Sequence, residues 1–263
     1  MRTFVLAMVA AMATTSAMAE TTVPAPAPVL SGEVSLDFAE TTNDKIGGTM
    51  GLDLGVDMGG LATVDLDFSA TDGNAVTLDN WTVGTTVAGV GVAFGDDNGL
   101  MPGAEGEQTL AAPAMTESLA LSMGDAAVAV GFTDWTADVT DISNVQGAYT
   151  FNLAPVSVTA MADYNMDSEN TVLGAEVGGV DVAGLAELGG AMTYDVDAEL
   201  LGYEGVVTAM GVTAYLNGDD TDLMQNIGGE YEMAVGGATF TAGANYNLDT
   251  EDFAPTAGIA FAF

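Results

Sequence analysis

The chain contains no cysteine and no histidine in its 263 residues. The absence of cysteine excludes disulfides and thiolate chemistry, and the absence of histidine excludes Ser-His triads and imidazole-bound metals. Carboxylate pairs are the only acids and bases left for a hydrolase. Asp and Glu are so abundant that no particular pair stands out, so we predict no catalytic residue and no enzymatic activity.

Basic residues are almost absent as well. The chain has 2 Lys and Arg residues against 38 Asp and Glu residues, a formal net charge of −36. Nucleic-acid binding needs a basic surface, so nucleic acid is excluded as a partner, and anionic partners are repelled at long range. Disordered acidic chains are poor in apolar residues. This chain is 49% hydrophobic with a mean hydropathy of +0.33, which favours a folded protein.

Long hydrophobic runs are confined to the N-terminus. Residues 1–19 contain Arg2, an apolar run of about ten residues and a small-residue cleavage site at Ala19, which predicts a secretory signal peptide. A membrane anchor would need roughly 20 apolar residues. Cleavage would leave 263 − 19 = 244 residues with Lys45 as the single base, a side-chain charge of 1 − 38 = −37. Residues 20–29 read as a Pro-rich lead-in.

Apolar and polar residues alternate with period two along the rest of the chain. In residues 62–69, Val64 and Leu66 lie on one face. Asp65 and Asp67 lie on the other. This pattern recurs and predicts β-strands with one apolar and one polar face. We expect strands at residues 31–39, 46–58, 61–69, 75–87, 90–95, 117–123, 126–133, 145–153, 156–164, 171–178, 181–194, 200–206, 208–216, 224–235, 238–246 and 255–263.

The connections between these strands are of two alternating kinds. One kind is short and marked by Gly or Pro, at residues 58–60, 88–89, 124–125, 154–155, 178–179 and 236–237. The other kind is longer and acidic. This alternation predicts an all-β, transmembrane antiparallel up-and-down β-barrel over residues 30–263. We expect sixteen strands, with a bulge near Trp81; fourteen strands also fit because the join near Val206 is weak.

The apolar faces contain many Ala, Gly and Met residues, which suit a lipid-facing wall better than the closely packed core of a β-sandwich. Sixteen meandering strands also exceed the usual sandwich. Aromatic residues near the loop ends of strands would form an interfacial girdle: Phe38, Phe68, Tyr164, Tyr194, Tyr215 and Tyr246. In the last strand, Ile259, Phe261 and Phe263 face outward, and this strand would close the barrel against the first.

The leader, the sixteen alternating strands and the terminal Phe263 together resemble the Gram-negative general porins, particularly the alphaproteobacterial type. The resemblance implies a protein of the outer membrane, surrounded by its lipid, and a homotrimer. It also implies that Phe263 is an assembly signal, read by the outer-membrane assembly machinery through the C-terminal strand.

The longest connection, residues 95–117, follows the fifth expected strand. In the porins that this chain resembles, the loop at this place folds into the barrel and narrows the pore. The resemblance makes Asp96, Asp97, Glu105 and Glu107 candidates for the constriction; the alternative is an ordinary, long external loop. Such porins carry an arginine cluster opposite the loop, and this chain has none.

The polar faces of the strands would line an aqueous passage. The predicted pore-lining acids are Asp37, Asp53, Asp57, Asp65, Asp67, Asp163, Glu176, Glu187, Glu230 and Glu232. Carboxylates along a water-filled passage attract cations and repel anions, which predicts a cation-selective channel. We predict no cofactor and no defined metal site, although crowded carboxylates would loosely bind Ca²⁺ or other cations.

The sequence therefore favours a porin for passive diffusion and transmembrane transport of small hydrophilic solutes and ions. Two alternatives stay open. One is a non-conducting outer-membrane barrel that acts as an adhesin, a phage receptor or a structural surface protein. The other is a secreted, soluble acidic β-protein, which would stay monodisperse without detergent.

Overall fold

A computed structural model describes residues 27–41, 45–71, 75–96, 98–102, 115, 117–133, 142–222 and 224–263. The expected leader, residues 20–26 of the lead-in, and the loop acids Asp97, Glu105 and Glu107 lie outside the described residues. Among the described residues, no helix is long and apolar enough to cross a membrane.

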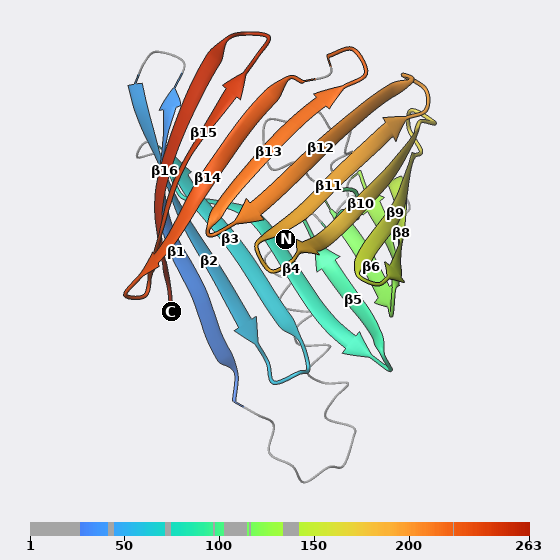
Figure 1. Ribbon diagram of the computed structural model, residues 1–263. Helices are drawn as coiled ribbons and strands as arrows, with labels where there is room; N and C mark the ends of the chain where they lie inside the picture. The colour runs from blue at the N-terminus through green and yellow to red at the C-terminus, as the bar shows by residue number, and fades with distance from the viewer. Residues whose placement is uncertain are drawn as a thin grey trace.

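The chain forms a closed barrel of sixteen antiparallel strands, each paired with its neighbours in sequence (Figure 1). The predicted all-β barrel and its strand number are confirmed. The strands are β1 (Val29–Thr41), β2 (Lys45–Asp57), β3 (Thr63–Thr71), β4 (Thr77–Val87), β5 (Val90–Gly95), β6 (Ser118–Met123), β7 (Ala126–Phe132), β8 (Ile142–Leu153), β9 (Val156–Asn165), β10 (Thr171–Val182), β11 (Ala186–Asp195), β12 (Leu200–Ala209), β13 (Val212–Asp219), β14 (Asn226–Val235), β15 (Ala238–Asn247) and β16 (Asp252–Ala262).

The barrel closes where β16 pairs with β1. The paired segment runs from Glu33 opposite Ala262 to Ala39 opposite Thr256. Phe263 continues the ladder beyond β16: its N–H donates to the Gly32 carbonyl at 2.9 Å, and its carbonyl accepts from the Gly32 N–H at 3.1 Å. Closure satisfies backbone groups that an open sheet edge would leave unpaired in hydrocarbon.

Short turns gather at one end of the barrel and longer connections at the other, at the lower and upper ends in Figure 1. One expected turn is wrong. Gly178 and Gly179 form an irregularity inside β10, where the register with β11 shifts between Val177 and Val180. The chain turns later, at Ala183 and Gly184, which both have positive φ. The bulge expected near Trp81 is confirmed, because the β3–β4 register shifts beside Asp67.

The two faces of the wall differ as the period-two pattern predicts. Large apolar side chains such as Leu36, Leu173 and Phe240 are exposed on the outer face. The strand register places acidic and small polar residues on the inner face. An exposed apolar outer face suits hydrocarbon rather than water.

The buried hydrophobic cluster lies on the outward side of β4, β5 and β7. Trp81, Val83, Phe94 and Phe132 are each less than a tenth exposed. Trp81 and Phe94 pack edge to face, with ring centroids 5.4 Å apart. Register defines their side of the wall, because Val83 pairs with Val64 and with Phe94. This part of the outer wall is therefore packed more closely than the rest.

Candidate functional site: the inner face of the barrel

Carboxylates meet across the inner faces of the first three strands. Asp53 on β2 is directly opposite Glu33 on β1 and Asp67 on β3, so these three form one row. Asp65 lies two residues from Asp67 on the same face. Directly opposed like charges destabilise a sheet unless water or cations screen them. The row therefore needs an aqueous or cation-rich surrounding.

Glu33 is absent from the predicted pore-lining residues although it completes this row. The sequence could have identified Glu33 as an inward residue, because Glu33 and Asp37 alternate with Val34 and Leu36 in one period-two pattern. The expected strand started at residue 31 and contained Glu33.

The other predicted acids are spread around the inner face. Asp37 lies near the β1–β16 closure, opposite Gly258. Asp57 ends β2 at the short-turn end, where its Oδ1 accepts a hydrogen bond from Gly60 N at 3.1 Å. Four acids lie farther around the wall, on the inner faces of β10, β11 and β14: Glu176, Glu187, Glu230 and Glu232. Except for Asp67 and Asp163, the ten predicted acids are exposed.

Asp163 is the one fully buried residue among the ten predicted acids. Its side chain is on the inner face of β9, in register with Gln146, but it is only 1% exposed. Asn144 Nδ2 donates a hydrogen bond of 2.8 Å to Asp163 Oδ1. A carboxylate with this little exposure does not meet water directly, so Asp163 is a buried structural group rather than part of an open lining.

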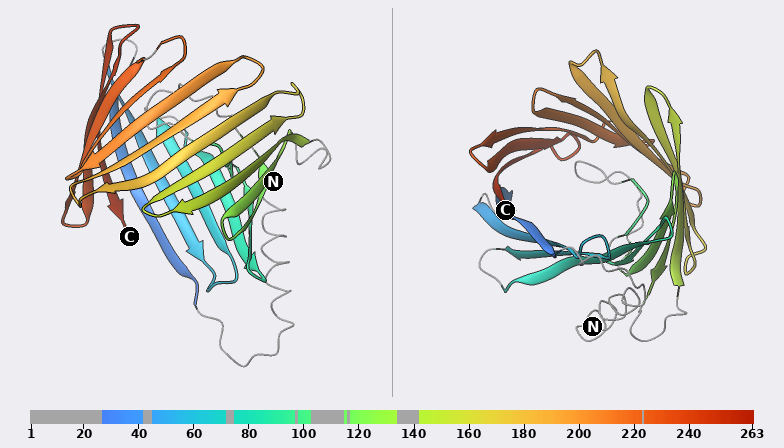
Figure 2. Two further views of the ribbon diagram at one scale, coloured as in Figure 1. Left: turned by 45° about the vertical axis from the view of Figure 1, so that its right-hand side comes forward. Right: turned by 90° about the horizontal axis from the view of Figure 1, so that it is seen from below.

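The described part of the connection between β5 and β6 lies against the inner wall. Leu100 N donates a 2.6 Å hydrogen bond to Gln146 Oε1 on β8. The side chains of Met101 and Pro102 approach Gly174 on β10, where an added Cβ would lie 3.0 and 3.1 Å from them. In the view along the barrel in Figure 2, this segment runs inside the ring of strands.

Both described ends of this connection have inward partners. Asn98 N and Nδ2 each donate to Ser118 Oγ at 3.2 Å, and Ser118 is fully buried. Met115 is 2% exposed and its Cε would lie 3.0 Å from a Cβ on Gly131. Of the four candidate constriction acids, only Asp96 is described; its N–H donates to the Trp81 carbonyl at 2.8 Å.

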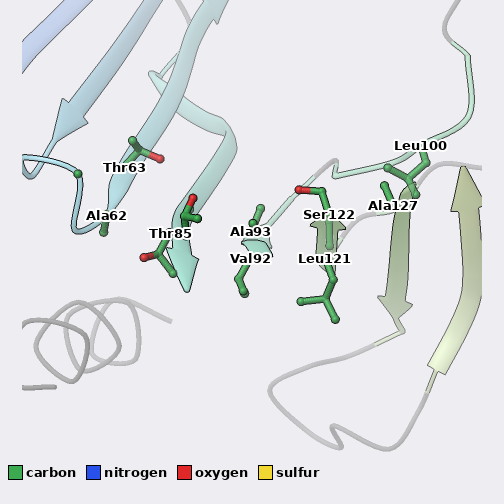
Figure 3. A pocket seen from close by; sticks show the side chains of 14 residues that line it. Ala62, Thr63, Thr85, Val92, Ala93, Leu100, Leu121, Ser122 and Ala127 are labelled. Atoms are coloured by element: carbon green, nitrogen blue, oxygen red, sulfur yellow. The ribbon is translucent and has the colours of Figure 1, made fainter. Parts of the chain in front are cut away.

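A cavity of about 360 Å³ lies between β3–β7 and the described part of this connection (Figure 3). Its lining includes Thr63, Thr85, Leu100 and Ser122 and contains no ionisable side chain. Among the described residues, the inner-face acids therefore lie outside this cavity, in the row on β1–β3 and on β10, β11 and β14.

Among the described residues, no group of three or more carboxylates is arranged to hold a metal ion. Two acidic loops resemble the start of calcium-binding loops, but the asparagine that begins each one accepts hydrogen bonds from the loop backbone. Asn165 Oδ1 accepts from the N–H groups of Asp167 and Ser168, at 3.0 and 2.9 Å. Asn247 Oδ1 does the same for Asp249 and Thr250. These asparagines stabilise turns.

The fold and its faces define a class of protein. A closed barrel of sixteen antiparallel strands, apolar outside and acidic inside, has the architecture of transmembrane barrels of the porin type. No protein-family model and no curated protein matches the chain.

Solved porin structures are similar to this chain. The porin of Rhodopseudomonas blastica has a TM-score of 0.58 and 14% identity, covering 90% of this chain and 100% of that one. OprB of Pseudomonas putida has a TM-score of 0.57 and 11% identity, covering 90% and 93%. OmpT of Vibrio cholerae, an outer membrane protein with loop L8 deleted, has a TM-score of 0.50 and 13% identity, covering 90% and 99%. At these identities the likeness establishes a porin fold.

Proposed function

We propose that the protein is an outer-membrane porin through which small hydrophilic solutes and ions diffuse passively, with a preference for cations. The observation that carries this proposal is the row of Glu33, Asp53 and Asp67 on the inner face of a closed barrel. No enzymatic step is part of it. The porin fold of the neighbours supports the outer membrane as the location.

The cation preference follows from the charge balance. The inner-face acids have almost no basic counterpart, because Lys45 is the single base outside the expected leader. A low-dielectric wall lined by one sign of charge focuses its field into the passage. Cations are then concentrated and anions are excluded, as in channels that use acidic rings.

Reversal potential in planar bilayers tests the preference. A tenfold KCl gradient across a reconstituted channel gives a reversal potential whose sign reports whether K⁺ or Cl⁻ is more permeant. We expect K⁺. A preference for Cl⁻ would contradict the acidic passage while leaving the barrel intact, and the double variant Asp53→Asn/Asp67→Asn should move the potential toward zero.

The connection between β5 and β6 is proposed to fold inward over its whole length, residues 95–117, and to set the constriction. The contacts of Leu100 with Gln146 and of Met101 with Gly174 support this path. Neutralising Asp96, Asp97, Glu105 and Glu107 together should then weaken cation preference. Unchanged selectivity would mean that the constriction is elsewhere.

The proposal extends to partners. The porin fold supports a homotrimer in outer-membrane lipid, assembled through the C-terminal strand and Phe263 after removal of the leader. Crowded carboxylates on β1–β3 would hold Ca²⁺ or Na⁺ loosely.

A non-conducting barrel is the second candidate. It is favoured by the burial of polar side chains on the inner face of β11–β14, where Thr193, Glu204, Asn217 and Asn226 are at most 6% exposed. Part of the inner wall is therefore covered. Reconstituted protein that inserts into bilayers without producing any conductance steps would favour this candidate.

A further inference from the structure

A second recess, of about 340 Å³, lies on the inner face of β12–β16, across the barrel from the cavity of Figure 3. Two adjacent rows of the sheet build it. Tyr215, Gly228 and Asn245 are directly opposite one another on β13, β14 and β15. The next row contains Thr213, Glu230, Gly243 and Thr256 on β13 to β16. We call this recess the Tyr215 recess.

Two glycines leave the space that forms the recess. Gly228 has no side chain, and the Tyr215 ring occupies the space in which a Cβ of that residue would lie. Gly243, in the second row, leaves space beside Thr256, whose Oγ1 would be 2.9 Å from an added Cβ. The ring thus lies across the sheet, and the recess is within the size range of small-molecule sites, about 300–1,000 Å³.

Tyr215 was expected at the outward aromatic girdle, and this expectation is wrong. The strand register places the Tyr215 side chain on the inner face, because Tyr215 is two residues from Asn217 and directly opposite Gly228, which are both on that face. Leu216 and Ala214 take the outward positions of β13. An aromatic ring is therefore available within the barrel.

Glu230 and Asn245 supply the carboxylate and amide acceptors of the recess, beside Thr and Tyr hydroxyls that can both donate and accept. The Glu230 side chain is exposed to the inside of the barrel. Asn245 Oδ1 is buried and accepts no hydrogen bond within the described part of the chain. Thr208 and Thr213 already share a hydrogen bond of 3.1 Å between their hydroxyls. The lining contains no Lys or Arg.

These groups select a ligand by its charge and its donors. A carboxylate attracts a cation, and the face of an aromatic ring carries negative potential that also favours a cation. A buried acceptor without a donor is unfavourable, so a ligand N–H that reached Asn245 would remove that cost. The ligand should therefore be cationic, rich in N–H donors and partly apolar.

We propose that the Tyr215 recess binds small organic cations that carry a primary ammonium group. The ammonium binds the Glu230 carboxylate, the Asn245 side chain rotates so that its buried amide oxygen accepts from the same ammonium, and the alkyl part covers the Tyr215 ring. The inference rests on the proposed function to the extent that the ligand enters through a water-filled barrel. A neutral sugar, whose hydroxyls also donate, is the competing ligand class.

Binding is measured on the purified full-length protein in detergent, by calorimetric titration with n-butylammonium chloride. Tetramethylammonium has the same charge without N–H donors, and glucose has donors without charge. We expect saturable binding of n-butylammonium, weaker binding of tetramethylammonium and no binding of glucose. Glucose binding, or equal affinity for both cations, would overturn the proposal.

Variants locate the site. Glu230→Gln should weaken n-butylammonium binding by about tenfold, since the amide oxygen still accepts a hydrogen bond but the negative charge that strengthens it is lost. Tyr215→Leu should weaken it by about fivefold through loss of the ring face, whereas Tyr215→Phe should retain it. Glu199→Gln removes one carboxylate from the exposed turn before β12 and should leave affinity unchanged. If Glu230→Gln and Glu199→Gln behave alike, binding is diffuse attraction and the proposal is wrong.

The same proteins are then tested for conduction. In planar bilayers, n-butylammonium should reduce K⁺ current in the wild-type channel and less so in Glu230→Gln. Binding in calorimetry without any channel conductance would sink the porin proposal and leave the recess intact. Conductance without saturable binding would overturn the recess proposal and leave the porin proposal intact.

Discussion

At the scale of single residues, Asp163 shows that an inward position does not guarantee contact with water. Its Oδ1 accepts from Asn144, and its Oδ2 is buried without a hydrogen bond among the described residues. The segment containing Leu100 approaches Gln146, the register partner of Asp163. The carboxyl group therefore belongs to a polar contact that joins β8 and β9 beneath that segment.

This contact predicts how Asp163 can be replaced. Asp163→Ala leaves the buried Asn144 Nδ2 without its acceptor and should lower the free energy of unfolding by about 1–3 kcal/mol. Asp163→Asn keeps an amide oxygen in the place of Oδ1 and should cost clearly less. Urea unfolding of the protein in phospholipid vesicles measures both, and equal losses would show that the hydrogen bond contributes nothing.

The sequence could not distinguish Asp163 from the exposed inner acids. Asp163 and Asp65 occupy the same kind of position in the alternating pattern, between apolar outward neighbours. Burial of Asp163 depends on long-range contacts, which period two does not encode. Tyr215 is similar: Tyr215 and Tyr246 both stand near a loop end, but only register with Gly228 places Tyr215 inside.

At the scale of the strand, alternation defines two surfaces with opposite tolerance for charge, and β10 offers a matched pair. Leu173 is 47% exposed on the outer face. Glu176 is on the inner face, three residues along. Leu173→Lys should lower the free energy of unfolding in bilayers by about 1–2 kcal/mol, because Leu173 is the third residue of β10 and the cost of a lysine falls from about 2–4 kcal/mol at the bilayer midplane to about 0–1 kcal/mol near the interfaces.

Glu176→Lys is the control, because its side chain stays in the aqueous interior. It should change stability much less and shift ion selectivity instead. Urea unfolding in lipid and reversal potentials are measured on both variants. Equal destabilisation by the two lysines would contradict the assignment of the faces.

The last strand supplies a second matched pair. Phe261 and Phe263 both point outward and are 49% and 59% exposed, and Phe263 also exchanges two backbone hydrogen bonds with Gly32. Truncation of either ring to Ala removes comparable apolar area from the lipid-facing surface. If Phe263 is the assembly signal, Phe263→Ala should reduce the amount of barrel in outer-membrane fractions far more than Phe261→Ala. Similar yields would mean that Phe263 contributes to barrel closure and is not the assembly signal.

Strand number and the faces were predictable because each strand repeats the same two-residue pattern. The boundaries of the strands were less predictable at glycine pairs. Gly178–Gly179 has the composition of a tight turn, yet β10 continues through it to Val182. The Ala183–Gly184 turn is held by Asp181 Oδ1, which accepts a hydrogen bond of 2.6 Å from Gly184 N. A side-chain contact of this kind decides between two glycine-containing candidates, and composition alone does not.

At the scale of the whole molecule, the acids are arranged asymmetrically around the barrel. One set is concentrated on the inner faces of β1–β3, and the Tyr215 recess with Glu230 lies on β12–β16. The described part of the connection after β5 lies against β8–β10, between these regions. A cation inside the barrel would therefore meet the acidic row and the aromatic recess on different parts of the wall.

This arrangement predicts a strong dependence of selectivity on salt. The Debye length is about 10 Å at 0.1 M ionic strength and about 3 Å at 1 M, so the field of wall carboxylates reaches the middle of the passage only in dilute salt. The K⁺ to Cl⁻ permeability ratio should be high at 0.1 M KCl and fall toward one at 1 M. Asp53→Asn/Asp67→Asn should lower the ratio at 0.1 M and change it little at 1 M. A ratio that does not vary with salt would show that close contact at a narrow site, rather than the field of the acidic wall, selects the ion.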